Sequence, residues 1–327
     1  MVKRNAWAPN LLFIAEKIEE LHNSSWLKSH RCSFDMLGEA SRNQHQSNKY
    51  FESYLESINL ISDINNSKGL NNGISIKLSA LYSKYDALHY KEVNNFLFPR
   101  VVTLIKEAMN KDVAVTIDAE EQDRLGLSLE LMNGVALHKE IKAWPKLGLA
   151  VQAYGKRSLE ALQYLDQLSQ QRSKMHVRLV KGAYWDYEIK NSQVKGLPGY
   201  PVFTNKQLTD LSYLVAAKKL IKYKNIEASF ATHNAHSIAA IMSLANKHNA
   251  DVEFQRLYGM GELLYLACEK SFNNFQKTSI YCPIGEHKEL LPYLVRRLLE
   301  NGANSSFINK YLNHFSNKCP HNELERN

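Results

Sequence analysis

Ten polar or charged side chains stand at the ends of short runs of small and β-branched residues. They are Glu39, Lys77, Asp118, Gln152, Arg178, Lys181, Thr232, His233, Gln255 and Tyr281. A fixed cation such as Arg178 stabilises negative charge that develops during a reaction. A carboxylate such as Asp118 can orient that cation, and a lysine in an apolar stretch, such as Lys77, can form a Schiff base. The set has the composition of an active site, provided that the fold brings the ends of the runs together.

The runs themselves have the side chains of buried strands. They cover residues 34–39, 74–81, 113–121, 147–154, 175–185, 228–234, 252–261 and 278–286. Stretches with helical spacing lie between most of them, at residues 91–111, 157–170, 206–223, 236–248 and 288–301, and asparagine pairs at 65–66 and 71–72 predict loops. Alternating strands and helices predict a (β/α)8 barrel, in which the carboxyl ends of all eight strands meet at one catalytic mouth.

Length and composition agree with one barrel. Such barrels often reach roughly 250 residues or more as one domain, and the chain has 327 residues, 44% of them hydrophobic. No apolar run approaches the roughly 20 residues that span a bilayer, and the cysteines show no CxxC spacing, as expected for reduced cytoplasmic thiols. We expect a cytoplasmic protein with a helical extension over residues 1–32, a barrel over 33–308 and a polar tail over 309–327.

A formal net charge of +8 raises the question of an acidic partner such as nucleic acid or an anionic membrane. The basic residues are dispersed through helical segments, for example at Lys218, Lys219, Lys222 and Lys224, and form no long basic block. A solvated basic face is the preferred interpretation. A non-catalytic module that uses this face for binding stays open as an alternative.

Seven segments carry a more specific signal. They are residues 34–39 (FDMLGE), 75–80 (SIKLSA), 118–121 (DAEE), 178–186 (RLVKGAYWD), 230–236 (FATHNAH), 259–262 (GMGE) and 293–304 (YLVRRLLENGAN). In order and spacing they resemble the proline dehydrogenase domain of the bifunctional proline utilization flavoproteins, from about Ser33 to Ile308. The resemblance implies a distorted (β/α)8 barrel that holds FAD noncovalently and oxidises L-proline to Δ1-pyrroline-5-carboxylate.

The resemblance also implies how the substrate is held. It assigns to the substrate Lys77, Tyr184, Tyr281, Arg296 and Arg297, and to a gate Glu39 and Glu300. The guanidinium groups of Arg296 and Arg297 would bind the substrate carboxylate, which fits their bidentate fork. Lys77 would be a third cation near that carboxylate. The two tyrosines would form apolar walls with hydroxyl tips around a small ring.

A second set is implied for the FAD. It comprises Ala119, Gln152, Arg178, Val180, Lys181, Gly182, Ala183, Trp185, Thr204, Thr232, His233, Asn234 and Gln255. Arg178 would stabilise the negative charge of the reduced flavin and Asp118 would orient it, which makes these two the predicted catalytic residues. Gly182 would let the cofactor approach the backbone, and Trp185 would stack on the flavin. His233 and His236 lack an evident third ligand, so no metal site is predicted.

Two positions depart from the family's pattern. Asn205 stands where related sequences carry a basic residue, which predicts the loss of one cofactor contact or of a neighbouring salt bridge. Pro292 lies four residues before Arg296, so the helix there is expected to start near residue 290 or to bend.

The resemblance implies partners as well as a reaction. Electrons are expected to pass to a membrane quinone through peripheral contact, at the inner face of the membrane. No segment resembles the nucleic-acid-binding or aldehyde dehydrogenase modules of the bifunctional relatives. The pyrroline-5-carboxylate dehydrogenase is therefore expected to be separate or missing, and the chain to be a fragment, an excised domain or a stand-alone version.

The residues alone leave a second enzyme class open. Lys77 could serve as the Schiff-base lysine of an aldolase-like lyase, with Asp118 or Glu39 as its acid-base partner.

Overall fold

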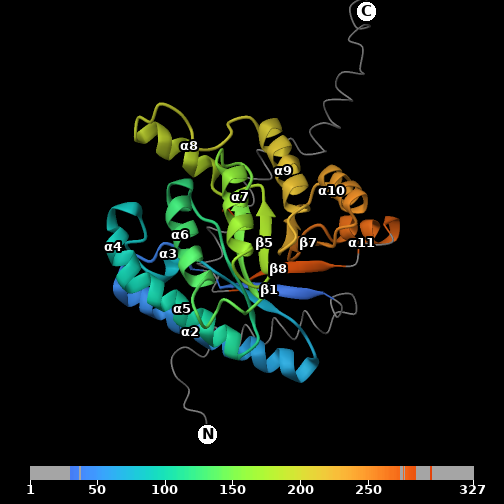
Figure 1. The fold of residues 1–327 in the computed structure, drawn as a ribbon. Coiled ribbons are helices and arrows are strands. Elements are labelled where there is room, and N and C mark those ends of the chain that lie inside the picture. The colour runs from blue at the N-terminus through green and yellow to red at the C-terminus, as the bar shows by residue number, and fades with distance from the viewer. Residues whose placement is uncertain (1–29, 37, 273–274, 276, 285–294, 297–327) are drawn as a thin grey trace, which may run out of the picture.

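The strands of the computed structural model close into a parallel barrel (Figure 1). The structure describes residues 30–36, 38–272, 275, 277–284 and 295–296. The strands are β1 Arg31–Met36, β2 Gly73–Ile76, β3 Ala114–Ile117, β4 Leu147–Gln152, β5 Met175–Val180, β6 Ile226–Ala231, β7 Val252–Leu257 and β8 Thr278–Ile284. Consecutive strands pair in parallel, and β8 closes the barrel on β1, with Tyr281 opposite Ser33. The predicted (β/α)8 barrel is confirmed.

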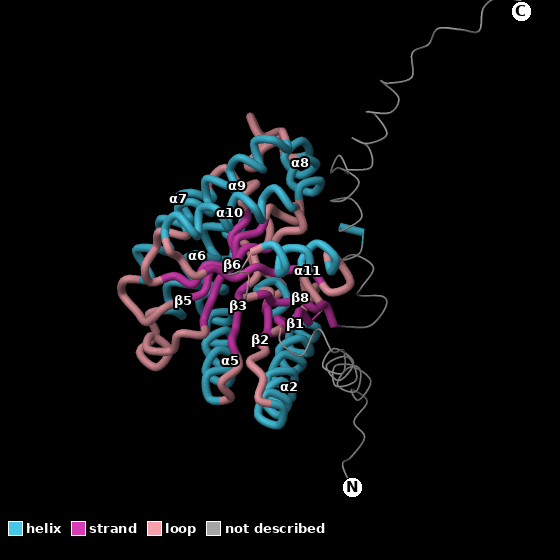
Figure 2. Tube along the Cα trace, turned by 90° about the vertical axis from the view of Figure 1, so that its right-hand side faces the viewer, coloured by secondary structure: helices cyan, strands magenta, loops and turns pink. Residues whose placement is uncertain are grey.

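Helices follow most of the strands and form the outer layer (Figures 1 and 2). They are α2 Gln44–Lys68, α3 Leu78–Leu81, α4 Tyr90–Glu92, α5 Phe98–Asn110, α6 Leu125–Ala136, α7 Ser158–Ser169, α8 Trp185–Val194, α9 Lys206–Leu220, α10 Ala235–His248 and α11 Glu262–Ser271. The helices predicted at residues 157–170, 206–223 and 236–248 are α7, α9 and α10. The one predicted at 91–111 is divided into α4, a π-helical turn and α5. The one predicted at 288–301 lies outside the described residues, apart from Val295 and Arg296, which are helical.

The loop predicted at residues 65–66 is wrong, because α2 continues through both asparagines. The side chain of Asn43 caps the start of α2, and Gly69, at φ 64°, ends the helix in the left-handed conformation. Asn65 exchanges two hydrogen bonds of 3.0 Å with the main chain of Asn72, which lies in the loop predicted at 71–72. Asn65 therefore ties the end of α2 to the start of β2.

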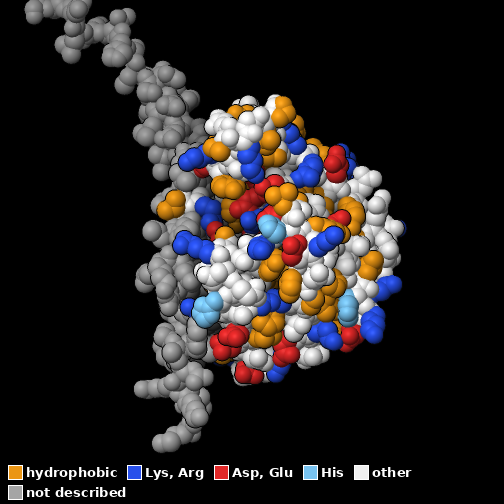
Figure 3. Space-filling view, turned by 90° about the vertical axis from the view of Figure 1, so that its left-hand side faces the viewer, with side chains coloured by type: hydrophobic (Ala, Val, Ile, Leu, Met, Phe, Trp, Pro, Cys, Tyr) orange, Lys and Arg blue, Asp and Glu red, His pale blue; other side chains and the backbone are white. Residues whose placement is uncertain are grey.

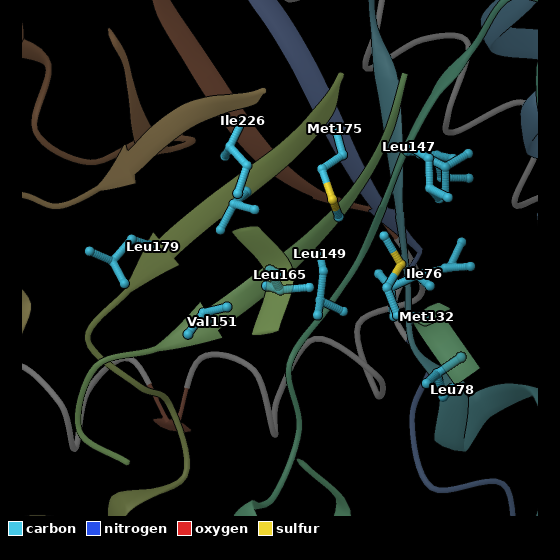
Figure 4. Close-up of a cluster of buried hydrophobic side chains, with 14 of the residues drawn as sticks. Ile76, Leu78, Met132, Leu147, Leu149, Val151, Leu165, Met175, Leu179 and Ile226 are labelled. Carbon is cyan, nitrogen blue, oxygen red and sulfur yellow. The ribbon is translucent and has the colours of Figure 1, made fainter. Parts of the chain in front are cut away.

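Most outward-facing side chains of the strands are apolar and pack against the helices. Figure 4 shows part of this layer, in which strand residues meet residues of α6 and α7. The labelled strand residues are Ile76, Leu147, Leu149, Val151, Met175, Leu179 and Ile226, and all are 7% exposed or less. Burial of each such side chain contributes about 1.5 to 3 kcal/mol. This layer is the main hydrophobic core of the fold.

The inward-facing side chains are small or polar instead. On β1, β2 and β3 they include Ser33, Asp35, Gly73, Ser75, Ala114 and Thr116. Lys77 and Asp118 continue this face directly after β2 and β3. Bulky branched side chains usually fill the inside of such a barrel. Here small residues leave space, and two cavities lie within the barrel, one at each end, with Arg178 and Gln255 lining both.

Several strands end before the predicted runs do. The run at 175–185 is divided between β5, which ends at Val180, and α8, which begins at Trp185. The run at 113–121 ends as a strand at Ile117, so that Asp118 follows β3 on a loop. These ends place the predicted site residues at the barrel mouth.

No helix within the described part of the chain is long and apolar enough to cross a membrane.

Candidate active site

A cavity of about 670 Å³ opens at the carboxyl ends of the strands. Its lining includes Lys77, Asp118, Gln152, Arg178, Lys181, Thr232, His233, Gln255 and Tyr281. The fold therefore brings together all the run-end residues singled out in the sequence except Glu39. The volume is that of a small-molecule site, and this end of a barrel is where active sites lie.

The floor of the cavity is a network centred on Asp118. Arg178 Nη1 donates a hydrogen bond of 2.8 Å to Asp118 Oδ1, and the Tyr281 hydroxyl donates one of 2.6 Å to Oδ2. Arg178 Nη2 also donates to the hydroxyls of Ser33 and Ser75, at 3.0 Å and 3.1 Å. Burial raises the pKa of Tyr281 well above its ordinary value, and Asp118 adds to the effect, so the hydroxyl stays a donor. Asp118 fixes Arg178 and Tyr281 relative to each other.

Lys77 lies on the same floor, between two carboxylates. Its side chain is 7% exposed, and its ammonium forms an ion pair with Asp35 and lies 3.5 Å from Asp118 Oδ2. Burial opposes a charge there, but the two carboxylates outweigh it and raise the pKa of Lys77 above its ordinary value. Lys77 is therefore held as an ammonium. A Schiff-base lysine must be a neutral amine to attack, so this environment disfavours the lyase alternative.

Glu39 and Arg296 form an ion pair next to the cavity. Nη1 and Nη2 of Arg296 donate to the two carboxylate oxygens of Glu39, the second at 3.1 Å. Tyr184 belongs to the same cluster, because its hydroxyl donates to Glu39 at 3.2 Å and its ring centroid lies 5.1 Å from Arg296 Cζ. The structure thus joins the predicted gate residue to an arginine predicted to bind substrate. Arg297 and Glu300 lie outside the described residues.

The cofactor residues predicted at the ends of β3, β4 and β5 line the cavity. Besides Gln152 and Lys181 they are Ala119, Val180, Gly182 and Ala183. Gln152 is fixed between two loops, since its Oε1 accepts from the main-chain N–H of Ala183 at 3.3 Å and its Nε2 donates to the carbonyl of Glu120 at 2.6 Å. Lys181 is ion-paired with Asp210 of α9. These contacts hold an amide and an ammonium at defined places in the wall.

Gly182 has a physical reason beyond the expected approach of the cofactor. Its φ of 137° is a conformation that favours glycine, and an added Cβ would lie 2.5 Å from the ring of Tyr154. Close packing on Tyr154 therefore requires the glycine by itself. Trp185 and Thr204 do not line the cavity: Trp185 is 37% exposed and donates through Nε1 to the carbonyl of Phe203, and Thr204 is exposed.

Three predicted cofactor residues follow β6 in succession. Asn234 caps α10 by accepting from the N–H of Ser237 at 2.9 Å, and its own N–H donates to Thr232 Oγ1 at 3.1 Å. His233 Nε2 accepts a hydrogen bond of 3.0 Å from the N–H of Leu257. A neutral His233 therefore carries its proton on Nδ1. All three residues line the cavity.

Gln255 connects the cavity to polar groups deeper in the barrel. Its Nε2 donates to Ser279 Oγ at 3.0 Å, and Ser279 in turn donates to Glu253 at 2.8 Å. Arg31 lies 2.7 Å from the other oxygen of Glu253. The orientation of Gln255 is thus fixed from the amino end of the barrel.

Four polar residues of the lining were not predicted as site residues: Asp35, Lys206, His236 and Arg256. A signal for Asp35 exists in the sequence, because the alternation of β1 puts it on the same face as Ser33. Lys206 follows Asn205, which caps α9 by accepting from the N–H of Gln207 at 2.8 Å. Related sequences carry a basic residue at position 205, and in this chain the basic residue is at position 206 instead.

The donors in this cavity fit an elongated anionic cofactor such as FAD. The floor offers Arg178, which is 2% exposed and whose Nε has no hydrogen-bond partner in the described structure. The walls and rim add the ammonium groups of Lys181 and Lys206 and the amide of Gln152. No cluster of three or more His, Cys, Asp or Glu residues suited to a metal occurs in the part of the chain that the structure describes.

Comparison with known proteins adds an independent finding. A family model described as proline dehydrogenase matches residues 15–310. The bifunctional protein PutA of Klebsiella aerogenes is 44% identical over 321 residues, which are 95% of this chain and 24% of that protein. The chain thus spans about a quarter of the length of this relative.

Solved structures show the same likeness. A mutant of Bradyrhizobium japonicum proline utilization A is 44% identical and superimposes with a TM-score of 0.78, over 85% of this chain and 29% of that chain. Proline utilization A from Bdellovibrio bacteriovorus, inactivated by N-propargylglycine, is 31% identical with a TM-score of 0.84, over 91% of this chain and 32% of that chain. Together with the barrel and the residues at its mouth, these matches show that the chain belongs to the proline dehydrogenase family.

Proposed function

We propose that this chain is an FAD-dependent proline dehydrogenase that oxidises L-proline to Δ1-pyrroline-5-carboxylate. The observation that carries the proposal is the network of Asp118, Arg178, Lys77 and Tyr281 on the floor of the cavity. The network contains two cations, each paired with a carboxylate, and a neutral hydroxyl, and these are groups that could orient a small anionic substrate and a reduced cofactor. Membership of the family supplies the reaction class.

Substrate binding follows from the residues at the edge of the floor. Arg296, together with Arg297, would clamp the carboxylate of proline through the guanidinium fork. Glu39 would act as a gate, since it now occupies Arg296 and would have to release at least part of it to a carboxylate. Tyr184 and Tyr281 would form the walls around the ring, and Lys77, as the third cation near the carboxylate, would lie below it with its charge offset by Asp35. Glu300 is proposed as a further gate residue.

The cofactor would lie against the wall from Gln152 to Lys181. FAD, when bound, supplies the acceptor for the hydride that leaves proline. Arg178 would stabilise the negative charge that arrives with the hydride, and Asp118 would keep Arg178 in place. The residues proposed to hold the FAD are Ala119, Gln152, Val180, Lys181, Gly182, Ala183, Trp185, Thr204, Thr232, His233, Asn234 and Gln255. Trp185 and Thr204 do not line the cavity.

The charged surroundings also bear on the protonation of proline. Oxidation requires a neutral amine, whereas the amine of free proline is protonated near neutral pH. Cations near a second cation disfavour its charged form. The clamp arginines Arg296 and Arg297 would therefore lower the pKa of the bound amine and favour the form that loses hydride, whereas the charges of Arg178 and Lys77 are offset by Asp118 and Asp35.

Further partners are proposed for the complete reaction. Electrons would pass to a membrane quinone during peripheral contact with the membrane, and a pyrroline-5-carboxylate dehydrogenase activity would oxidise the product. The membrane contact is compatible with a basic surface. Figure 3 shows, however, that Lys and Arg side chains are mixed with Asp and Glu on the face in view. That face therefore has no block of positive charge that would favour a non-catalytic binding module over an enzyme. Lys218, Lys219, Lys222 and Lys224 are all exposed.

The test is a visible spectrum of the purified protein incubated with FAD and freed of excess cofactor. We expect flavin absorption bands that bleach when L-proline is added without oxygen, with a product two mass units lighter than proline. Trapping on Lys77 by borohydride, in a colourless protein, would instead support a lyase. A protein that keeps FAD but is not bleached by proline would contradict the proposed substrate.

A further inference from the structure

On the cavity floor, the buried carboxylate of Asp35 pairs with Lys77. The sequence predicts a role in substrate binding for Lys77 but none for Asp35. Asp35 lies on β1, is 1% exposed and forms an ion pair with Lys77. Both residues line the cavity. The main-chain N–H of Lys77 is fixed as well, because it donates to the Tyr54 hydroxyl at 3.1 Å. Lys77 is thus held at both its backbone and its ammonium.

Asp35 sets the net charge of the floor. The floor contains two acids, Asp35 and Asp118, and two bases, Lys77 and Arg178. Arg178 is balanced by Asp118, and Lys77 by Asp35, so the four groups carry no net charge. A proton shared within the Asp35–Lys77 pair does not change this sum.

We propose that Asp35 is a positioning residue that holds the Lys77 ammonium on the floor and cancels its charge, so that the floor meets the cofactor and the substrate as a neutral, rigid surface. The inference rests on the proposed function, since it concerns the same cavity. Without Asp35, the floor would gain one positive charge, because Asp118 at 3.5 Å still favours the ammonium form of Lys77. With both Asp35 and Lys77 replaced, the floor would again be neutral.

The experiment compares the two-electron midpoint potential of bound FAD in three proteins: wild type, Asp35→Asn and the double variant Asp35→Asn with Lys77→Met. Extra positive charge favours the reduced, more negative flavin. We expect Asp35→Asn to favour reduction about tenfold, a rise of about 30 mV for a two-electron couple. The double variant should return to the wild-type potential. A chemical reductant is used, so proline oxidation is not needed.

The matched control is Asp210→Asn, which removes the carboxylate paired with Lys181 at the more exposed wall of the cavity. It should shift the potential less than Asp35→Asn does. The inference is overturned if Asp35→Asn keeps the wild-type potential, or if the double variant keeps the full shift of the single one.

A second measurement does not need bound FAD. If the protein binds no FAD, the proposed function is wrong, but the role of Asp35 can still be tested. Breaking a buried ion pair leaves one uncompensated charge, whereas replacing both members does not. Urea unfolding of the protein without cofactor should therefore show a lower midpoint for Asp35→Asn and a recovery of more than half of that loss in the double variant. An Asp35→Asn protein as stable as wild type would contradict the pairing.

Discussion

Along β4, Leu147, Leu149 and Val151 point outward into the helical layer, whereas Ala150 and Gln152 point inward to the cavity. The other strands repeat this division. Most outward positions carry large apolar groups that are almost fully buried, and most inward positions carry small or polar groups.

The outer face of the strands therefore serves the stability of the fold, and the inner face serves the chemistry of the site. The outer layer can supply the hydrophobic free energy of folding without any contribution from the inside of the barrel. The inner face is therefore free to hold ion pairs that contribute little net stability when they are buried. Substitutions on the two faces should produce different defects.

A large apolar truncation in the outer layer should produce the largest loss of stability. Leu149→Ala removes a side chain that is 1% exposed, and we expect the free energy of unfolding to fall by about 3 kcal/mol, because a cavity remains. Urea denaturation measures it. The matched control is Leu263→Ala on α11, where the leucine is 83% exposed and the change should stay within about 0.5 kcal/mol. Equal losses at both positions would mean that the outer layer is not the core.

Arg178→Met should lower the free energy of unfolding less than Leu149→Ala does, but it should slow the reduction of the flavin strongly. The variant loses the cation that Asp118 fixes on the floor. We expect the barrier to flavin reduction to rise by roughly 3 kcal/mol, about a hundredfold in rate, and FAD to bind more weakly. Stopped-flow reduction of the flavin-saturated variant by proline measures the rate. The exposed Arg42→Met serves as the control. An unchanged rate would remove Arg178 from the mechanism.

The comparison also shows what the sequence can and cannot predict. Strand and helix order, the barrel and the residues at the strand ends follow from hydrophobic runs, since each run ends on a polar group. Asp35 was missed because it lies inside a run, with the apolar Phe34 and Met36 on either side. Its partner Lys77 is 42 positions away, and only the register of β1 on β2 brings the two together.

Other failures have local causes. Asn65 and Asn66 suggested a loop, but tertiary hydrogen bonds to Asn72 outweigh their weak helix propensity. The close packing of Gly182 on the ring of Tyr154 was not foreseen either. A sequence without coordinates does not reveal which neighbour a glycine must accommodate.

Arg296→Lys tests the edge of the inner face with a moderate expected effect. The charge remains, but the planar fork that now meets Glu39 is lost. Proline should bind at least about tenfold more weakly, a loss of roughly 1.4 kcal/mol. Titration of the flavin spectrum with proline measures the affinity. Arg100→Lys on α5, where the guanidinium lies 5.4 Å from the Phe51 ring centroid, is a stacked-arginine control outside the cavity. The same affinity in wild type and Arg296→Lys would argue against the clamp.

The smallest effect should be a change of stability with pH from Glu120, which lies next to the floor. Burial raises the pKa of Glu120 from 4.5 to about 7. In this pH interval the folded state keeps a proton that the unfolded state has lost, so stability must fall as pH rises. Between about pH 5.5 and about pH 6.5 the loss should be about 1 kcal/mol, and Glu120→Gln should abolish this part of the slope. Urea unfolding at several pH values, with the exposed Glu227→Gln as control, measures it. A wild-type slope in Glu120→Gln would show that Glu120 does not titrate here.

The most direct test of the central claim is the rate of anaerobic flavin reduction by two substrates, L-proline and prolinol. Prolinol has the ring and the amine of proline but no carboxylate. If Arg296 and Arg297 hold a carboxylate above the floor, the wild-type protein should be reduced by proline at least about tenfold more efficiently than by prolinol. Equal efficiency with the two substrates would contradict the account, because the cations at the mouth of the barrel would then have no carboxylate to recognise.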